Sequence, residues 1–388
     1  MKKLLLATTA LVVMAGVAGA DEIKIGVILG FTGPLESITP AMGAAAEMAM
    51  KEVSDSGKLM GGSTVVSVRG DSTCVDAAAA TASAERLVTS DKVAAIMGAD
   101  CSGVTGAILQ NVARPNGVAM ISPSATSPAL STAEDDGLFF RTAPSDARQG
   151  VVMADVITGR GITSVALTYT NNDYGKGLAE SFQAAFEAAG GTITISAAHE
   201  DGKADYSAEV ASLAAAGGDL LVVAGYIDQG GKGIIQGSID SGAFSAFYLP
   251  DGMYGTPLID AIGAPLNGTF GDVPGTDSEG AATFQTMATA AGFDGTASFT
   301  GESYDAAALI MLAMAAANST ASKDWSAKVM DIANAPGELA KALDLIAAGT
   351  DIDYVGATAV ELIGGGESAG SYREYTVTDG KIVTDRYR

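Results

Sequence analysis

Short apolar runs alternate with alanine-rich or amphipathic segments along the first part of the chain. The first run, Glu22–Gly30, predicts a buried strand, and the segment Gly43–Gly57 predicts a helix. Further strands of this kind are expected at 64–72, 93–100 and 118–123, with helices at 77–91 and 103–116. Continuous apolar runs separated by helices are typical of parallel strands covered on both faces, so this rhythm predicts an α/β lobe.

The same alternation restarts after residue 150. It predicts strands at 164–171, 192–200, 219–226 and 246–252, and helices at 175–190, 206–217 and 230–242. The section from Pro274 to Gly370 contains a long apolar helix, Tyr304–Asn318, but too few strands for a domain of its own, and is expected to complete the first lobe. The last stretch, 371–388, predicts a hairpin on the second lobe.

These patterns predict an α/β fold of two Rossmann-like lobes with parallel sheets, joined by a three-segment hinge. Lobe 1 is expected to contain residues 21–142 plus 274–369, and lobe 2 residues 143–273 plus 370–388. The chain then crosses between the lobes three times. A cleft between two lobes is a preferred site for a small ligand.

Residues 1–20 have the pattern of a secretory signal peptide. Lys2 and Lys3 precede an apolar run, and Ala18-Gly19-Ala20 provides the small residues of a cleavage site. No later run of eighteen apolar residues predicts a membrane span, and no cysteine follows the cleavage site as a point of lipid attachment. We therefore expect a periplasmic protein with no direct membrane insertion, whose mature chain starts at Asp21.

The charge balance excludes two classes of partner. The chain has 45 acidic and 22 basic residues, a net charge of −23. Such a chain repels nucleic acid and anionic membrane surfaces, so neither is expected as a partner. With 48% hydrophobic and 17% charged residues the chain is globular, and the charge says little about the ligand.

The two cysteines, Cys74 and Cys101, lie 27 positions apart. In an oxidising compartment such a pair most simply forms one disulfide. The alternative, a metal-binding or nucleophilic pair, lacks support, because His199 is the only histidine and two thiolates do not complete a zinc site. We expect no metal and no cofactor.

Signatures of common enzymes are absent. The sequence contains no G-x-S-x-G, no phosphate-binding P-loop and no H-E-x-x-H. His199 is followed by Glu200 and Asp201, which predicts a solvated turn rather than a catalytic base. The glycines of Gly230–Gly237 are better explained by the start of a helix than by a dinucleotide-binding loop. An enzyme is therefore disfavoured.

Hydroxyl side chains follow two of the strands predicted for the first lobe. They are Ser102 and Thr105 after one strand, and Ser122, Ser124, Thr126 and Ser127 after the next. Parallel strands present their carboxyl ends to a ligand, and helix N-termini attract anions. The hydroxyls with free backbone amides predict a cradle for a carboxylate; simple helix capping remains an equally open alternative.

Different chemistry follows the strands predicted for the second lobe. Tyr174, Tyr226 and Asp251 each come at or just after a strand end. Two aromatic rings and a carboxylate suit an ammonium group. The two lobes together therefore predict a site for a zwitterion.

Several motifs give the chain a family resemblance that covers nearly all of the mature sequence. They are "IKIGVILGFTGPL", "DSTC…GADCSG", Ile121–Thr132, "NDYGKGLAES", "PDG" and "SYDAAALI", in this order. With them the chain resembles the leucine/isoleucine/valine-binding proteins of branched-chain amino-acid ABC importers, which are type I periplasmic binding proteins. The resemblance also supports the pairing of the two cysteines.

The resemblance implies a role for individual residues. It places the ligand's carboxylate at Ser102, Ser124, Ala125 and Thr126, its ammonium at Thr126 and Asp251, and Tyr174, Tyr226 and Phe299 over the ligand. Two departures from the family concern side-chain specificity. Asp251 stands where the family has glutamate, and the loop after the first strand lacks the family's tyrosine, so residues 35–39 are expected to reach in instead.

The resemblance implies capture of a hydrophobic, branched-chain-type amino acid by hinge closure, and delivery to the membrane permease of an ABC importer. A monomer is the default expectation, because closure about a hinge needs no second copy. Two alternatives keep the fold: a different small ligand, such as an aromatic carboxylate or an amide, or a sensor module that signals instead of feeding a transporter.

Overall fold

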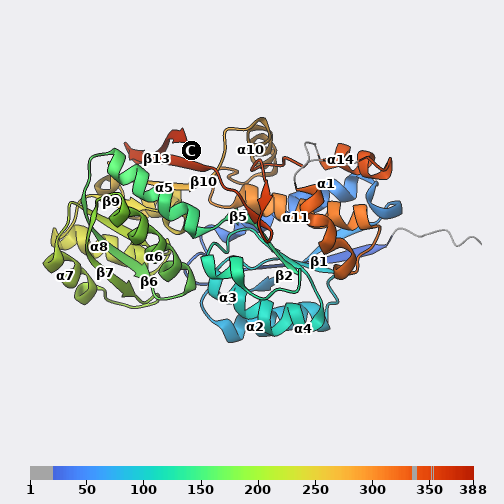
Figure 1. Cartoon of the computed structure of the whole chain (residues 1–388), viewed down its shortest axis with the longest axis horizontal. Helices are drawn as coiled ribbons and strands as arrows, with labels where there is room; N and C mark the ends of the chain where they lie inside the picture. The colour runs from blue at the N-terminus through green and yellow to red at the C-terminus, as the bar shows by residue number, and fades with distance from the viewer. Residues whose placement is uncertain (1–20, 334–338, 351, 353) are drawn as a thin grey trace, which may run out of the picture.

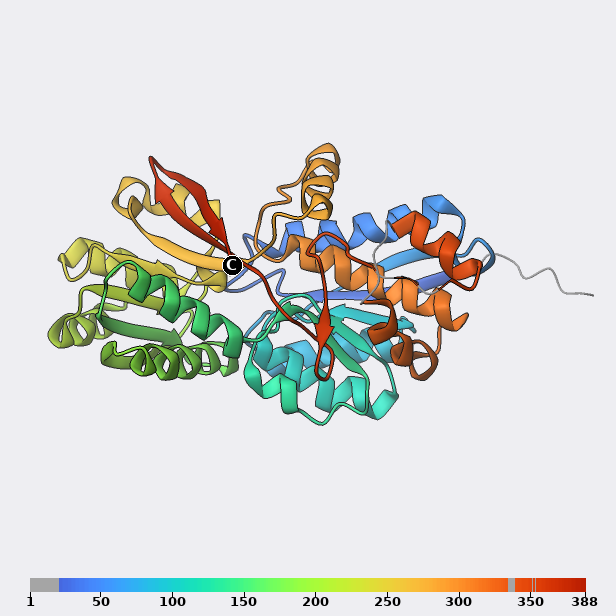
Figure 2. The same cartoon turned by 45° about the horizontal axis from the view of Figure 1, so that its top comes forward.

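The computed structural model describes residues 21–333, 339–350, 352 and 354–388. The predicted signal peptide, residues 1–20, lies outside this part. Two lobes lie side by side along the long axis of the molecule, each built on a seven-stranded sheet with helices around it (Figures 1 and 2). The predicted α/β class with two lobes is confirmed.

The sheet of lobe 1 has the order β11-β12-β5-β4-β3-β1-β2. Its strands are β1 (Glu22–Leu29), β2 (Thr64–Asp71), β3 (Ala95–Gly98), β4 (Met120–Ser122), β5 (Phe139–Pro144), β11 (Leu362–Ile363) and β12 (Glu367–Ser368). Every pairing is parallel except that of β11 with β12. The central strands are fully buried and apolar, as expected where helices cover both faces.

The sheet of lobe 2 has the order β14-β13-β10-β9-β8-β6-β7. Its strands are β6 (Ser164–Thr170), β7 (Thr192–His199), β8 (Leu220–Ala224), β9 (Phe247–Leu249), β10 (Phe270–Pro274), β13 (Tyr372–Thr378) and β14 (Lys381–Tyr387). The C-terminal hairpin β13–β14 pairs antiparallel with β10. Each sheet therefore has a parallel centre, as predicted, and an antiparallel edge.

Helices pack on both sheets. The longer ones are α1 (Thr39–Ser56), α2 (Ala77–Thr89), α5 (Asp146–Gly159), α6 (Asp173–Ala188), α7 (Ser207–Ala216), α8 (Gly230–Ser241), α10 (Glu279–Ala291), α11 (Thr300–Ala317) and α14 (Leu339–Ala347). The short ones are α3 (Ser102–Ile108), α4 (Arg114–Asn116), α9 (Thr256–Ile262), α12 (Ser322–Trp325) and α13 (Val329–Ile332). Helix α1 starts four residues before the predicted one, with a proline in its first turn.

Helix α11 explains where the third section of the chain belongs. Its residues from Glu302 to Met314 are all buried, so it has no polar face. They share one apolar core with α1, β1 and β3 of lobe 1. The long helix therefore completes the first lobe, although it starts at Thr300 and not at Tyr304 as predicted.

The chain crosses between the two sheets three times. The crossings lie between β5 and α5, after β10, and between β12 and β13. At the first, Pro144 ends β5 and Ser145 caps α5 by accepting a bond from the amide of Ala147 at 3.3 Å. The sequence patterns did not predict β5, α5 or β10, which form this hinge region.

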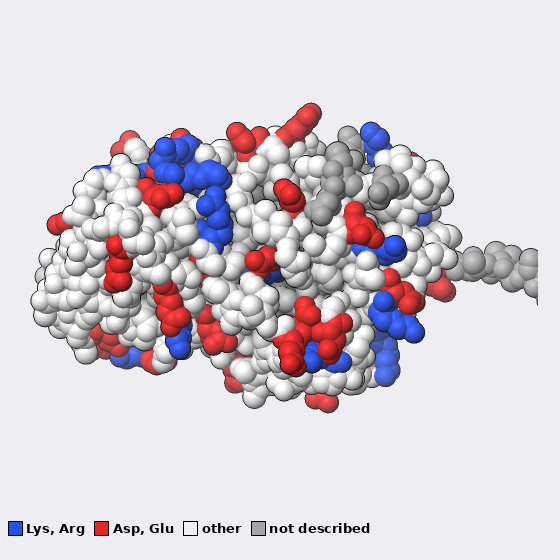
Figure 3. All heavy atoms as spheres, viewed as in Figure 1, with Lys and Arg blue, Asp and Glu red and all other residues white. Residues whose placement is uncertain are grey.

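Charged side chains are spread over the face seen in Figure 3, with a group of basic ones over the C-terminal hairpin. There Arg160, Arg386 and Arg388 all pair with the buried Glu374 at 2.7–3.1 Å. Burial opposes the Glu374 carboxylate, but the three arginines outweigh it and hold its pKa below the usual value. These pairs join the hairpin to α5 of lobe 2.

His199 does not lie in a solvated turn as predicted. It ends β7, is 1% exposed, and its Nδ1 lies 2.8 Å from the Thr168 hydroxyl. Burial lowers its pKa to about 4, so it is neutral at pH 7. The acidic neighbours in sequence misled the prediction, because the strand carries its side chain inward.

No helix in the described part of the chain combines the length and the apolar character that crossing a bilayer requires.

Candidate functional site

The strand order locates the site. The parallel strands have the orders β2-β1-β3-β4-β5 and β7-β6-β8-β9-β10. In each lobe the second strand lies on one side of the first strand, and the later strands are added on its other side, so the strand order reverses next to β1 and β6. In open α/β sheets a ligand binds at this switch point, outside the carboxyl ends of the two strands. The loops after β1 and β3 should therefore face those after β6 and β8.

A cavity of about 20 Å³ lies where these loops meet. It is lined from lobe 1 by Leu35, Ile38, Met42, Asp100, Cys101, Ser102, Ser124 and Phe299, and from lobe 2 by Tyr174, Tyr226, Asp251 and Gly252. Six of the eight predicted binding residues are therefore brought together. Ala125 and Thr126 are not among the lining residues.

The lobe 1 wall is built of hydroxyls that are already bonded. The Ser124 hydroxyl donates to the carbonyl of Asp100 at 3.0 Å, and the Ser102 hydroxyl accepts from the amide of Ser127 at 3.0 Å. The amides of Ser124 and Ala125 both donate to the Ser122 hydroxyl, at 3.3 and 2.9 Å. The expectation of free amides at these two residues is wrong, because Ser122 satisfies them from within the loop.

The buried Arg141 bonds to the backbone of this loop. It is 1% exposed, and its guanidinium donates to the carbonyls of Ala125 and Ser127 at 2.8 and 2.9 Å and to Glu367 at 2.5 Å. These bonds hold the backbone of the loop, and Ala125 is fully buried. The Thr126 hydroxyl lies near Asp146, and it is not in the cavity.

The lobe 2 wall carries two stacked phenol rings. Tyr174, in the first turn of α6, and Tyr226, just after β8, lie 5.2 Å apart between centroids with an interplanar angle of 16°. Asn172 caps α6 by accepting from the amide of Gly175 at 3.0 Å. The faces of such rings attract cations.

Asp251 completes that wall. It follows β9, is 2% exposed, and accepts a bond from the Tyr174 hydroxyl at 3.0 Å. Burial raises the pKa of Asp251 to about 6, although the Tyr174 bond acts in the opposite direction. A buried carboxylate without a cation is unfavourable, so this position is suited to a ligand that supplies one.

Two further carboxyls lie close to Asp251 in the hinge region. Asp146 starts α5, Asp272 lies in β10, and both are fully buried. Burial, and then the charge of Asp251, raise the pKa of Asp146 well above its usual value. Burial and the charge of Asp251 also raise the pKa of Asp272, to about 7. The sequence reasoning missed this cluster, because acidic residues far apart in an acidic chain carry no signal of proximity.

Asp100 is a third aspartate that the sequence reasoning missed, and it lies on the opposite wall. It is 1% exposed and accepts from the amide of Gly30 at 2.8 Å and from the Ser72 hydroxyl at 2.9 Å. Burial outweighs these bonds and raises its pKa. Its bonds join the loops after β1, β2 and β3, so it organises the lobe 1 side of the cavity.

Apolar side chains close the remaining side of the cavity. Leu35, Ile38, Met42 and Phe299 are each at most 7% exposed. The expectation that the 35–39 segment reaches in place of a tyrosine agrees with the positions of Leu35 and Ile38. The wall would accept a hydrocarbon side chain.

The cysteines form the predicted disulfide. Cys74 and Cys101 are bonded, with their Cα atoms 5.2 Å apart, and link the loop after β2 to the loop after β3. Cys101 thus places Ser102 at the cavity. Asp100 also lies beside the two sulfurs, but disulfide sulfurs are not thiolates and do not offer metal ligation.

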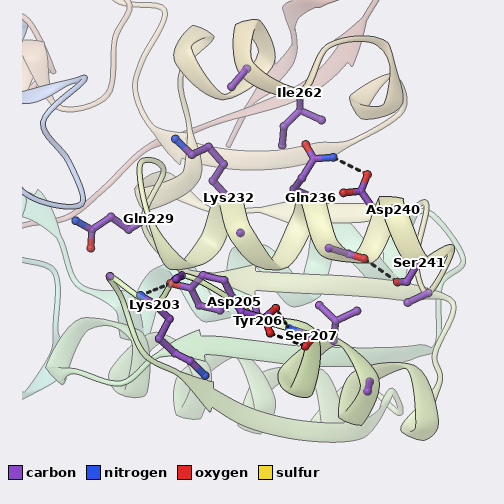
Figure 4. Close-up of a pocket in the computed structure, with 18 of the residues that line it drawn as sticks. Lys203, Asp205, Tyr206, Ser207, Gln229, Lys232, Gln236, Asp240, Ser241 and Ile262 are labelled. Carbon is purple, nitrogen blue, oxygen red and sulfur yellow. Dashed lines mark hydrogen bonds between the residues drawn. The ribbon is translucent and has the colours of Figure 1, made fainter.

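A larger groove, of about 1030 Å³, lies within lobe 2 between α7 and α8 (Figure 4). Lys203, Tyr206, Lys232 and Gln236 line it, and Gln236 donates to Asp240 of the same helix. None of the predicted binding residues lines this groove. It is open and formed by one lobe, so lobe closure would not enclose a ligand there.

Comparisons with known proteins give the family and the fold. The periplasmic binding protein family matches residues 22–336 of this chain. The Leu/Ile/Val-binding protein homolog 3 of Brucella melitensis is 32% identical over 230 residues, which are 58% of this chain and 61% of that relative. The alignment thus spans somewhat less than two thirds of the relative's length.

Solved structures share the fold. A leucine binding protein from Thermotoga maritima has a TM-score of 0.81 at 21% identity, covering 94% of this chain and 98% of that one. A solute binding protein of an ABC transporter from R. palustris, in complex with 4-hydroxybenzoate, has a TM-score of 0.75 at 20% identity, covering 94% of this chain and 96% of that one. At these identities the likeness is one of fold.

Proposed function

The chain belongs to the periplasmic binding protein family, and on that premise we propose that it captures a hydrophobic, branched-chain-type amino acid between its lobes for an ABC importer. One curated relative that it matches is a Leu/Ile/Val-binding protein homolog, and the Thermotoga protein of the same fold is a leucine binding protein. The family is extracytoplasmic and binds substrates without transforming them.

One observation carries the proposal: the two walls of the interlobe cavity differ in polarity. Lobe 1 presents the hydroxyls of Ser102 and Ser124 beside Asp100, whose carboxyl is bonded to Gly30 and Ser72, and lobe 2 presents Asp251 with two phenols. A zwitterion with its carboxylate toward the first wall and its ammonium toward Asp251 matches both. The apolar side, with Leu35 and Ile38, then takes the side chain.

Capture requires the lobes to move. A cavity of about 20 Å³ has room for about one water molecule, whereas small-molecule pockets usually have about 300 Å³ or more. We propose that the three crossings act as the hinge and that the units that move are 21–142 plus 274–369 and 143–273 plus 370–388. The ligand enters when the lobes are apart, and closure of the lobes buries the ligand.

We propose the binding roles from the residues that line the cavity. Ser102 and Ser124 hold the carboxylate, with Ala125 and Thr126 supporting the loop and the hinge cluster instead of touching the ligand. Asp251 holds the ammonium, the rings of Tyr174 and Tyr226 lie over the ligand, and Phe299 packs on the ligand's side chain. An opposite-charge contact near 4 Å contributes about 4 kcal/mol at an effective dielectric of 20, before desolvation is subtracted.

The cellular setting is part of the same proposal. Residues 1–20 are removed as a signal peptide, the mature chain works in the periplasm as a monomer, and its partner is the membrane permease of an ABC importer. No cofactor, metal or catalytic step is involved.

A second ligand class is favoured by one observation. The Asp251 pKa of about 6 means that protonation at mildly acidic pH removes the need for a cation, so an aromatic carboxylate could occupy the cavity. The R. palustris protein of this fold is complexed with such a ligand, 4-hydroxybenzoate. A sensor built on the same fold would bind the same ligands and is separated from a transporter only by its partner.

Calorimetric titration with matched ligands tests the proposal. L-leucine, L-isoleucine and L-valine should bind at pH 7.5 with affinities on the order of micromolar. 4-Methylpentanoate, which is leucine without its amino group, and leucinamide, which lacks the carboxylate, should each bind at least about a hundredfold more weakly. Binding of 4-hydroxybenzoate with no binding of the three amino acids would overturn the proposal in favour of the second ligand class.

A further inference from the structure

Two hydrogen bonds cross the cleft between a loop of lobe 1 and a single aspartate of lobe 2. The amide of Ser37 donates to Asp228 Oδ2 at 2.9 Å, and the amide of Asp228 donates to the carbonyl of Pro34 at 3.1 Å. Ser37 and Asp228 are 191 positions apart in sequence. The loop follows β1 and Asp228 follows β8, so both bonds exist only while the lobes are together.

The loop that Asp228 holds is also a wall of the ligand cavity. Leu35 and Ile38 line the cavity and are 7% and 4% exposed. Across the cleft, the side chains of Ile227 and Ile38 both pack close to Gly255. A Cβ atom added to Gly255 would lie 2.9 Å from Ile227 and 3.6 Å from Ile38. The apolar side of the loop therefore faces the ligand, while its backbone is bonded to Asp228.

We propose that Asp228 is a positioning residue that latches the 33–38 loop to lobe 2, and that this latch holds the cleft shut and thereby sets the lifetime of the bound ligand. Asp228 does not line the ligand cavity, so it acts through the loop. The ligand readout rests on the proposed function, whereas the latch itself does not.

The chemistry of the contact fits a latch. A carboxylate that accepts a backbone N–H makes a charge-assisted bond, which is stronger than a neutral one. When the lobes part, water solvates the carboxylate, the amides and the carbonyl, so the open state leaves no buried polar group unpaired. The two bonds therefore favour closure without making opening prohibitive, as a protein that must release its cargo requires.

Hydrogen–deuterium exchange of the ligand-free protein tests the latch directly. The segment containing residues 33–38 should exchange faster in Asp228→Ala than in the wild-type protein. Asp228→Asn should lie close to wild type, because the amide oxygen can still accept from Ser37. Equal exchange of this segment in the wild-type protein and Asp228→Ala would overturn the latch.

Calorimetric titration with L-leucine measures the effect of the latch on ligand affinity. Asp228→Ala should weaken the affinity about tenfold or more, through faster dissociation, and Asp228→Asn by no more than about threefold. Two matched controls should bind as wild type: Ser37→Ala, which keeps the backbone N–H, and Asp240→Ala, whose carboxylate accepts a bond from Gln236 of the same helix. Unchanged affinity in Asp228→Ala would also overturn the proposal.

The two proposals fail in different ways. If no amino acid binds the wild-type protein, the proposed function is wrong, and the exchange experiment still decides the latch. If leucine binds but the exchange rate or affinity is insensitive to Asp228→Ala, the proposed function stands and the latch is wrong. A loss of folding in Asp228→Ala would appear as a lowered melting temperature. In that case Asp228→Asn is compared with Asp228→Gln, because the longer glutamine side chain displaces its carbonyl oxygen from the loop by one methylene. Equal exchange and equal affinity in these two variants would overturn the latch.

Discussion

Asp251→Asn should make the ligand-free protein more stable while it removes amino-acid binding. The side chain is 2% exposed and accepts a bond from the Tyr174 hydroxyl at 3.0 Å. Asparagine has nearly the same shape, and its carbonyl oxygen can accept the same bond. The substitution therefore removes a buried negative charge with little change in packing.

The magnitude follows from the pKa. Burial raises the pKa of Asp251 from 3.8 to about 6 in the folded protein. Each unit of difference corresponds to 1.36 kcal/mol, so the ionised group costs the folded state about 3 kcal/mol at pH 7.5. For a chain of this size this is a rise in melting temperature of about 4 °C in the variant.

The dependence of the free energy of unfolding on pH tests the sign of this stability change separately. Because the folded pKa is above the unfolded one, the folded state binds more protons between pH 3.8 and about 6, and its stability falls as the pH rises through that window. The stability advantage of Asp251→Asn should therefore grow from pH 4 upward. Carboxyls outside the hinge region are common to both proteins and cancel in the difference, whereas Asp146 and Asp272, whose pKa values the charge of Asp251 raises, add to this growth.

Melting curves of the two proteins from pH 4 to pH 8, with and without L-leucine, measure both effects. The variant should melt higher without ligand and show no ligand-induced rise, since loss of a contact of about 4 kcal/mol is on the order of a thousandfold in affinity. A variant that is less stable at pH 7.5, or whose advantage does not change with pH, would refute the electrostatic reasoning. Undiminished leucine binding would refute the ammonium role.

Three further predictions concern other parts of the molecule. Replacing both Cys74 and Cys101 by alanine should lower the free energy of unfolding by about 3 kcal/mol, seen as a lower urea midpoint; an unchanged midpoint would contradict it. Ile38→Ala should weaken leucine binding by about 1.5–3 kcal/mol and affect alanine binding less, and equal losses in calorimetry would exclude contact with the ligand side chain. Gly177→Val should weaken binding of every ligand with little change in the melting temperature of the ligand-free protein, because a Cβ at Gly177 would lie 2.8 Å from Pro128 across the cleft; unchanged affinity would show that closure does not bring these residues together.

The polar residues at strand ends show how far local pattern reached. Tyr174, Tyr226 and Asp251 were picked out because they follow apolar runs, and parallel strands bring their carboxyl ends to one edge of a sheet. The same argument placed Ser102 and Ser124. It also picked out Thr126, which does not line the cavity, because a loop can turn successive residues to opposite sides; here Arg141 holds the loop through the carbonyls of Ala125 and Ser127.

What the sequence by itself determined about this protein is its class: the alternation of buried strands and helices, the long apolar α11, the cysteine pair and the side chains at strand ends. These features are local, because hydrophobic periodicity reflects which face of one element is buried. The tertiary structure alone decided the rest: the proximity of Asp146 and Asp272 to Asp251, the burial of His199, and the contact of Asp228 with the 33–38 loop. Residues so far apart meet only through the way two lobes dock, and charge or polarity in a sequence does not reveal whether folding leaves a side chain in water or takes it out.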